Sequence, residues 1–394
     1  MTFLEGVRVL DATRMIAGPL ASMYLGDLGA EVVKVEQPGR GELTREFGPF
    51  VDGESAYFAS LNRNKQCLTL DLATDEGSNI FLELAAEVDI VLENFKPGVT
   101  EHFGIDYDSV HDVNDDVVYC TITGFGEDSP YADTPAFDMV VQAMGGAMSV
   151  TGEPNGPPVR SNVPMGDVAP AMFAVQSILA ALYARDVGDV GGERIEVSML
   201  DAMISWLGPR AARSVVLDEP YPRTGTAHEE FAPYRRFETA DSHVVVCVAA
   251  ESLWPRFCRA IDHEELIDDP RFATNADRSA SQDALYEHLE PIFERRSTTE
   301  WVERLRDHGV PVGPVYDTLE LWNDPHVEHR ELLQWLPGDR AGEELPSVAY
   351  PVQFSGDLDD PSAPEAIGAS TERYLRDLGY SPETIESLAE NGVI

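Results

Sequence analysis

The chain has 394 residues, of which 43% are hydrophobic and 25% charged, so it is long enough for two domains and too apolar for a disordered protein. Acidic residues outnumber basic ones by 70 to 28, and the resulting net charge of −42 argues against nucleic acid and anionic lipid as partners. No apolar run of about 18 residues predicts a membrane helix, no export leader is visible, and the four cysteines are scattered, so we expect a cytoplasmic protein without a membrane partner.

The first half of the chain alternates short apolar strands with helices. The predicted strands cover 7–11, 31–36, 66–72, 89–93, 116–123 and 194–197. The predicted helices cover 18–28, 74–86, a short segment after Pro97, and a long apolar segment over 168–184. Strands separated by helices form a mostly parallel sheet, so we predict an α/β fold with a Rossmann-like large domain. The first turn lacks a GxGxxG pattern, so a dinucleotide site is not supported.

The second half predicts a smaller α/β domain. A strand is expected over 244–248, and helices are expected near 253–261, 281–295, 299–308 and 370–378. Stretches rich in Pro, Gly and charged residues indicate linkers on either side of this domain. The predicted division is a large domain over 1–208 completed by 347–394, a linker over 209–233, a small domain over 234–316, and a return linker over 317–346.

Several catalytic patterns are absent from the sequence. There is no GxSxG, P-loop or HExxH motif. The nine histidines are scattered, and the nearest pair, His326 and His329, has no third ligand beside it. We therefore predict neither a nucleophilic serine or cysteine, nor a bound metal, nor a permanently bound cofactor.

Three loops at strand ends favour an anionic ligand. They cover 36–41, 62–65 and 94–98, and backbone N–H groups at such positions can face a ligand. The chain has only three lysines among its 28 basic residues, and all lie in the first hundred residues: Lys34, Lys65 and Lys96. Their placement predicts contacts to a polyanion such as coenzyme A (CoA) or a nucleotide. Scarce lysine on a dispersed acidic surface also predicts a salt-adapted (halophilic) organism.

Asp167 follows a Gly- and Pro-rich loop over 145–160 and precedes the long apolar helix. One interpretation is a plain helix N-cap. The other is a carboxylate held at the positive end of the helix dipole, facing a loop that can approach a substrate closely. The residues alone leave both interpretations open.

At these residues the chain resembles the family III (class III) CoA-transferases, the group of formyl-CoA transferase, carnitine-type CoA-transferases and α-methylacyl-CoA racemases. The matching stretches follow the family's order along the chain: 6–11, 17–19, 29–36, 62–65, 93–98, 137–142, 145–152, 166–167, 269–272, 309–314 and 324–330. The resemblance implies a Rossmann-like large domain built from both chain ends, a smaller α/β domain, and an interlocked homodimer.

The resemblance also implies roles for individual residues. The family's nucleophilic aspartate falls on Asp167. The implied CoA-binding residues are Lys65, Asn94, Arg40, Gln37, His102, Lys96 and Asp138. Backbone groups near Gly145 and Gly146 are candidates for stabilising an oxyanion. The candidates around an acceptor carboxylate are Arg14, Ile16, Arg45, Arg160, Arg223 and His228. Gln37 and His102 replace basic residues of formyl-CoA transferase, and Ile16 replaces a glutamine, which argues against formyl-CoA and oxalate.

The implied reaction moves CoA from an acyl-CoA thioester to a carboxylic acid through an aspartyl anhydride and an aspartyl–CoA thioester. The expected substrates are succinyl-CoA and a dicarboxylate such as mesaconate. One alternative is an intramolecular C1-to-C4 shift of CoA on mesaconyl-CoA. A racemase is disfavoured because Phe137 stands where that branch has a histidine base. A CoA-binding protein without turnover is the remaining alternative.

Overall fold

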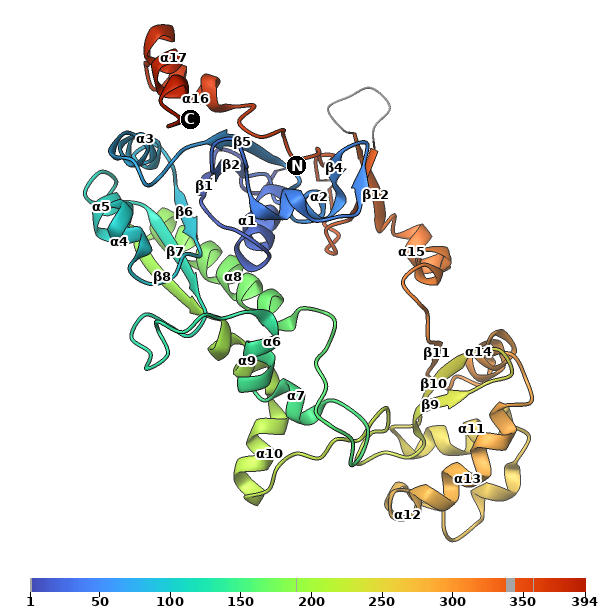
Figure 1. The fold of residues 1–394 in the computed structure, drawn as a ribbon. Coiled ribbons are helices and arrows are strands. Elements are labelled where there is room, and N and C mark those ends of the chain that lie inside the picture. Colours follow the sequence, from blue (N-terminus) through green and yellow to red (C-terminus); the bar gives the residue numbers. More distant parts are fainter. Residues whose placement is uncertain (1, 189, 338–343, 357) are drawn as a thin grey trace. The chain divides into compact units, whose positions relative to one another are not determined.

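The structure is a computed structural model that describes residues 2–188, 190–337, 344–356 and 358–394 (Figure 1). The chain divides into two compact units. The large unit comprises residues 1–148, 160–219 and 328–394, and the small unit comprises 149–159 and 220–327. The loop over 149–159 therefore belongs to the small unit, whereas the sequence analysis placed it in the large domain.

A six-stranded parallel sheet forms the centre of the large unit. Its strands, in spatial order, are β5 (Lys65–Thr69), β2 (Glu31–Glu36), β1 (Arg8–Asp11), β6 (Ile90–Glu93), β7 (Val118–Thr123) and β8 (Glu193–Ser198). This is the doubly wound order, which reverses direction between β1 and β6. The predicted Rossmann-like sheet is confirmed, and ligands of such sheets bind beyond the carboxyl ends of the strands at the point of reversal.

Helices cover both faces of this sheet. On one face lie α1 (Ala17–Asp27), α8 (Met165–Val187) and α9 (Met199–Leu207), and on the other lie α3 (Asp75–Ala85), α16 (Thr371–Asp377) and α17 (Pro382–Glu390). Successive side chains of β1 point to opposite faces of the sheet, so Val9 belongs to the first core and Leu10 to the second. The C-terminal helices, red in Figure 1, lie beside α3 and complete the large unit.

Helix α8 is long and apolar enough to cross a membrane by length and composition alone. Its buried side chains, Ala171, Ala174, Ile178 and Leu182 among them, belong to the first core together with residues of α1 and β7. Packing against these elements accounts for the apolar composition of the helix.

The small unit is built on an antiparallel sheet of β11 (Val312–Pro314), β10 (His243–Cys247) and β9 (Tyr234–Glu238). Its helices are α11 (Trp254–Ala260), α12 (Asn275–Ala280), α13 (Gln282–Phe293) and α14 (Thr298–Asp307). Aromatic side chains dominate its separate core: the rings of Phe237 and Phe293 stack at 4.3 Å, and Trp301 lies against Phe293 at 4.8 Å.

The two predicted linkers contain regular elements. The segment 209–233 begins with α10 (Pro209–Leu217), in which Pro209 takes the first helical position instead of breaking the chain. The segment 317–346 contains η4 (Glu320–Asn323), α15 (Pro325–His329), β12 (Leu333–Pro337) and the start of β13 (Glu344–Val348), while 338–343 lie outside the described residues. The two segments predicted as linkers therefore contain helices and strands in addition to loops.

The remaining short elements are η1 (Leu43–Glu46), β3 (Phe50–Val51), β4 (Glu54–Ser55), α2 (Ala56–Asn62), α4 (Val99–Phe103), α5 (Tyr107–His111), α6 (Asp138–Met144), α7 (Ala147–Val150), η2 (Glu251–Leu253) and η3 (Glu264–Ile267).

Candidate active site

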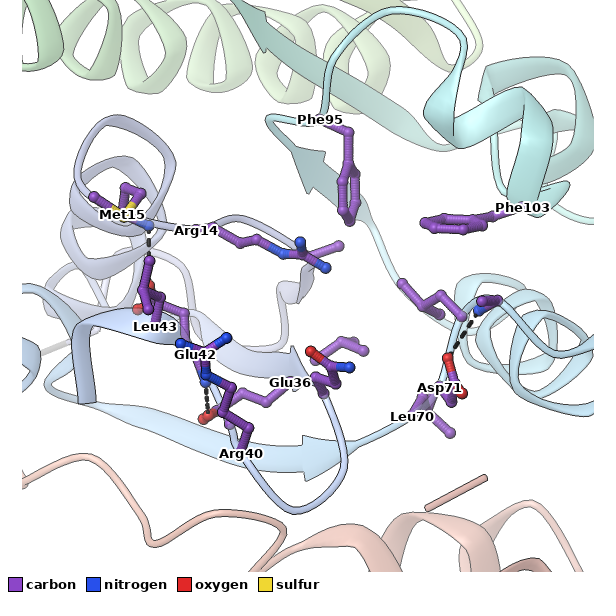
Figure 2. A pocket seen from close by; sticks show the side chains of 16 residues that line it. Arg14, Met15, Glu36, Arg40, Glu42, Leu43, Leu70, Asp71, Phe95 and Phe103 are labelled. Atoms are coloured by element: carbon purple, nitrogen blue, oxygen red, sulfur yellow. Dashed lines mark hydrogen bonds between the residues drawn. The ribbon is translucent and has the colours of Figure 1, made fainter. Parts of the chain in front are cut away.

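A cavity of about 410 Å³ opens in the large unit at the carboxyl ends of β1, β2, β5 and β6, where the strand order reverses. Figure 2 shows Arg14 reaching into it from the loop after β1, with Phe95 and Phe103 forming the opposite wall. Two of the predicted CoA-binding residues, Gln37 and Arg40, also line it. An apolar wall beside cationic side chains suits a planar heterocycle that carries anionic groups.

Asn94 holds the two loops at the point of reversal together. Its side-chain oxygen accepts a hydrogen bond from the backbone N–H of Arg14 at 2.8 Å, and its amide nitrogen donates to the Arg14 carbonyl at 2.9 Å. The Arg14 guanidinium carbon then lies 4.7 Å from the centroid of the Phe95 ring. Asn94 was predicted to bind CoA, but in this structure its polar groups position Arg14 instead.

Three other predicted CoA-binding side chains lie at or near the rim of this cavity. Arg40 is exposed and pairs with Glu46 at 2.7 Å. The exposed His102 ring lies 5.7 Å from that of Phe103, which lines the cavity. Lys96 is exposed on the loop after β6. All three side chains are exposed, and their predicted role stays a prediction.

The predicted contact between Lys65 and CoA is wrong. The Lys65 side chain is fully buried, and its Nζ lies 3.0 Å from Asp11 Oδ2. The ammonium also donates to the Pro19 carbonyl at 2.9 Å and to the Asn62 side-chain oxygen at 2.8 Å. These acceptors satisfy all three of its protons, so the ammonium serves the core of the large unit and not a ligand.

Asp167 lies in the first turn of α8, half-buried. The helix begins at Met165 with Pro164 in the capping position, so the N-cap interpretation of Asp167 is wrong. Burial, and then the neighbouring charge of Asp138, raise the pKa of Asp167 to about 7. A carboxyl group that titrates near neutrality at a helix N-terminus has the features of a tuned reactive group.

Asp138 braces the start of α8. Its Oδ1 accepts hydrogen bonds from the Gly166 backbone N–H and from the Gln142 side chain, each at 2.9 Å. A Cβ atom on residue 166 would lie 3.0 Å from the Asp138 carbonyl and carboxylate oxygens, so only glycine allows this close approach. Asp138 was predicted to contact CoA, but these bonds give it a positioning role next to Asp167.

Tyr57 on α2 lies near enough to both Asp167 and Glu42 for their charges to act on its hydroxyl. Burial raises the pKa of its hydroxyl, and the charges of Asp167 and Glu42 raise it further. Tyr57 therefore lies within electrostatic reach of both carboxyl groups, and Glu42 lines the cavity. The sequence analysis missed Tyr57, because no motif or spacing marks a lone tyrosine on a short helix.

Comparison with known proteins agrees with this arrangement. The family model described as CoA-transferase family III matches residues 4–369. The chain belongs to this family. It is 35% identical over 396 residues to succinyl-CoA:glutarate CoA-transferase of Homo sapiens, covering 99% of this chain and 90% of that protein.

A second relative is succinyl-CoA:mesaconate CoA-transferase of Haloarcula hispanica, 35% identical over 380 residues and 92% of each chain. A crystal structure of a CAIB/BAIF family protein from Brucella suis matches with a TM-score of 0.87 and 32% identity over 96% of this chain and 99% of that one. The predicted family and the predicted class of enzyme are confirmed.

A family III CoA-transferase needs donors for the oxyanion that forms during acyl transfer. Gly145 was a candidate, but its N–H already donates to the Val141 carbonyl at 2.8 Å at the end of α6, so this prediction is wrong for the described conformation. Gly146 has a φ of +83°, a conformation that favours glycine, and its role stays a prediction.

The candidate acceptor-binding residues fall into two groups. Arg45 and Arg223 are engaged internally. Arg45 binds Glu36 through two hydrogen bonds of 2.6 and 2.8 Å, with its side chain only 10% exposed. Arg223 donates to the carbonyls of Ser149 and Gly156 within the small unit. The Arg45 guanidinium is closed to a substrate carboxylate in this conformation, so that prediction is wrong here. Arg223 is half-buried and lines a cavity of the small unit, so its predicted role stays a prediction.

The second group of acceptor candidates consists of Arg160, Ile16, Arg14 and His228. Arg160 has a side chain 48% exposed and lies 3.9 Å from Asp138. Ile16 immediately precedes α1, and Arg14 lines the cavity. His228, in the small unit, accepts the Glu230 N–H on its Nδ1 at 3.0 Å, which leaves Nε2 for other partners. Their predicted roles stay predictions.

The Arg14→Gln variant should raise the KM for acyl-CoA about tenfold while changing kcat less, because the substitution removes a cation from the cavity but leaves Asp167 in place. Steady-state kinetics with varied acyl-CoA measure this. The matched control is Arg376→Gln, which removes an exposed arginine paired with Glu372 on α16. Equal KM values for the two variants would contradict a role of the cavity in CoA binding.

Proposed function

We propose that the chain transfers CoA from succinyl-CoA to a dicarboxylic acid, with mesaconate as the preferred acceptor and Asp167 as the covalent nucleophile. The observation that carries the proposal is the Asp167 carboxyl group at the start of α8, with Asp138 and Tyr57 beside it. The two relatives with succinyl-CoA in their names support the choice of donor.

The proposed reaction has two halves. The Asp167 carboxylate attacks the thioester carbonyl, which forms an aspartyl–acyl anhydride and expels CoA thiolate. The thiolate attacks the Asp167 carbonyl, which breaks the anhydride, releases the donor acid as a carboxylate and leaves an aspartyl–CoA thioester. The acceptor carboxylate then attacks this thioester and repeats the two steps in reverse, so no oxidant, metal or net proton is required.

The ionisation of Asp167 sets the expected pH dependence. Only the carboxylate is nucleophilic, and burial together with Asp138 raises its pKa to about 7. The value of kcat/KM should therefore fall about tenfold per pH unit below pH 7 and level off above it. A profile that is flat between pH 5 and pH 8 would contradict the role of the free Asp167 carboxylate.

The Asp138→Asn variant tests whether the charge of Asp138 contributes to the raised pKa of Asp167. Asparagine keeps an oxygen that can accept the Gly166 N–H but removes the negative charge near Asp167. The pKa that governs kcat/KM should shift to lower pH, although burial keeps it above that of an exposed aspartate. The inflection of the pH–rate profile measures this shift.

The acceptor is tested with a panel of acids. Succinyl-CoA is mixed with mesaconate, glutarate or oxalate in molar KCl, and the acyl-CoA products are separated by chromatography. We expect mesaconyl-CoA to form fastest and oxalyl-CoA slowest, because Ile16 replaces a polar glutamine of formyl-CoA transferase. Faster transfer to glutarate would reassign the acceptor without affecting the nucleophile. Formation of mesaconyl-CoA isomers without any free acid would instead favour the intramolecular shift.

We also propose that the protein is a salt-adapted cytoplasmic homodimer. Lys34 and Lys65 are buried, at 0% and 2% exposure, so Lys96 is the one exposed lysine on a chain of net charge −42. On α10, Val215 and Val216 are more than 80% exposed, which supports a partner subunit on that helix. Light scattering in molar KCl should give twice the chain mass, and a monomer at all salt concentrations would contradict the dimer.

A further inference from the structure

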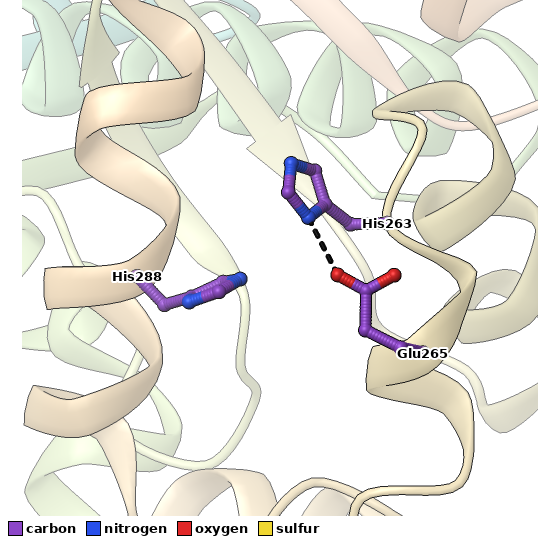
Figure 3. A group of neighbouring side chains, drawn as sticks. All are labelled: His263, Glu265 and His288. Atoms are coloured by element: carbon purple, nitrogen blue, oxygen red, sulfur yellow. Dashed lines mark hydrogen bonds and ion pairs between the residues drawn. The ribbon is translucent and has the colours of Figure 1, made fainter.

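The small unit brings together two histidines and a glutamate that the sequence keeps apart. Figure 3 shows His288 of α13 extending toward His263 and Glu265, which flank the start of η3. One ligand atom from each of the three lies within 4.8 Å of the other two. Within the part of the chain that the structure describes, this is the one group of three or more His, Cys, Asp or Glu side chains that meets this geometry.

The geometry already orients the first imidazole. His263 Nδ1 lies 2.8 Å from Glu265 Oε1, so the ring nitrogen and the carboxylate oxygen that would both bind the metal already face each other. The His263 and His288 rings are nearly perpendicular, with centroids 5.4 Å apart and an interplanar angle of 87°. A Zn²⁺ ion bound by both atoms would take the place of the proton in this hydrogen bond.

The backbone that carries these side chains is held on both sides. The His263 N–H donates to the Cys258 carbonyl at 2.9 Å, and Leu266 of η3 is buried in the small unit's core. His288 stands one residue before Leu289 and three after Leu285, which are both fully buried. Metal binding would therefore need only side-chain rotation, because the two elements are already fixed by packing.

The donor set favours Zn²⁺ over the hard cations. Two imidazoles and a carboxylate are typical zinc ligands, whereas Mg²⁺ and Ca²⁺ take oxygen ligands only. Zinc bonds of about 2.1 Å require the donor atoms to draw together from their present separation. Asp269, whose side chain is 21% exposed and pairs with Arg271, is close enough to His288 for an electrostatic interaction and can supply a second carboxylate.

We propose that His263, Glu265 and His288 form a Zn²⁺ site that links the turn before η3 to α13 and stabilises the small unit. The three residues of this site belong to the small unit, whereas Asp167, Asp138 and Tyr57 belong to the large unit. Neither the family nor the sequence motifs assign a metal to these residues.

Metal-free protein is titrated with ZnCl₂ to test this proposal. Isothermal calorimetry measures binding, and the melting temperature measures the change in stability. We expect one Zn²⁺ per chain and a rise in melting temperature, with no response to MgCl₂. Co²⁺ in place of Zn²⁺ should give the visible absorption of a nitrogen- and oxygen-ligated ion.

The His288→Gln and Glu265→Gln variants should weaken Zn²⁺ binding at least tenfold, because each removes one ligand from an exposed position and leaves the core intact. His326→Gln on α15 removes an exposed histidine elsewhere and should bind Zn²⁺ as the unsubstituted chain does. Circular dichroism checks that the variants fold. The proposal is overturned if the unsubstituted chain binds no Zn²⁺, or if His288→Gln and His326→Gln bind it equally.

Discussion

The Asp167→Asn variant should lose CoA transfer by roughly 10⁴-fold or more, because the amide cannot form the anhydride or the thioester. The cavity at the carboxyl ends of the strands is lined by loops that do not include Asp167, so we expect acyl-CoA still to bind. Chromatography of acyl-CoA species measures the loss of transfer, and calorimetry with a non-reactive CoA analogue measures binding.

Trapping during turnover identifies the reacting side chain directly. Hydroxylamine converts an aspartyl thioester or anhydride into a hydroxamate, which peptide mass spectrometry locates. The label should fall on Asp167, should require succinyl-CoA and should disappear in Asp167→Asn. Asp283→Asn, in the first turn of α13, is the matched control and should keep full activity. A label on any other residue would refute the proposed nucleophile.

The Asp167→Asn variant should also be more stable than the unsubstituted chain, by an amount that depends on pH. Burial and Asp138 raise the folded-state pKa of Asp167 to about 7, so folding favours its neutral form. The stability of the unsubstituted chain is therefore lost as pH rises through about 7, and asparagine avoids this loss. Asp167→Asn should be more stable by a few kcal/mol at pH 8, and by less at pH 5, in urea unfolding. A stability change that is independent of pH would contradict the raised pKa.

The fold was largely predictable because its main strands and helices carry strong local signals. The central strands β6 and β7 are short apolar runs, and α8 is a long one. Helix α17 was missed although Ser381 caps it and Pro382 begins it, because its polar sequence resembles a loop. Helix α10 was missed for a related reason, since the segment that starts at Pro209 was interpreted as a linker.

The site was predictable only in part, because a sequence shows where charges are and not which of them are already compensated. Two of the three predicted ligand loops, those after β2 and β6, line the cavity, whereas the loop after β1 was not predicted. Lys65 was wrongly assigned because its partner Asp11 reaches it only through the parallel pairing of the sheet. Arg45 was wrongly assigned because the loop after β2 folds back and places it against Glu36. The pair of His263 and His288 was missed for the same reason, because it depends on the packing of α13 against the turn before η3.

The Lys65→Met variant should destabilise the large unit by about 3–5 kcal/mol, because it leaves the Asp11 carboxylate buried without its main counter-ion. Both side chains of this pair are fully buried. Burial alone would raise the pKa of Asp11, but Lys65 and Lys34, with hydrogen bonds from Ser22 and Thr13, outweigh it and lower the pKa below its usual range. Urea unfolding in molar KCl measures the loss.

Two further variants separate the buried charge from the loss of packing. Arg376→Met removes a partner from the exposed pair with Glu372 and should cost at most about 0.5 kcal/mol. Adding Asp11→Asn to Lys65→Met removes the uncompensated charge, so the double variant should be more stable than Lys65→Met alone. If Lys65→Met were no less stable than Arg376→Met, Lys65 would not stabilise the core, and its assignment as a CoA ligand would have to be reconsidered.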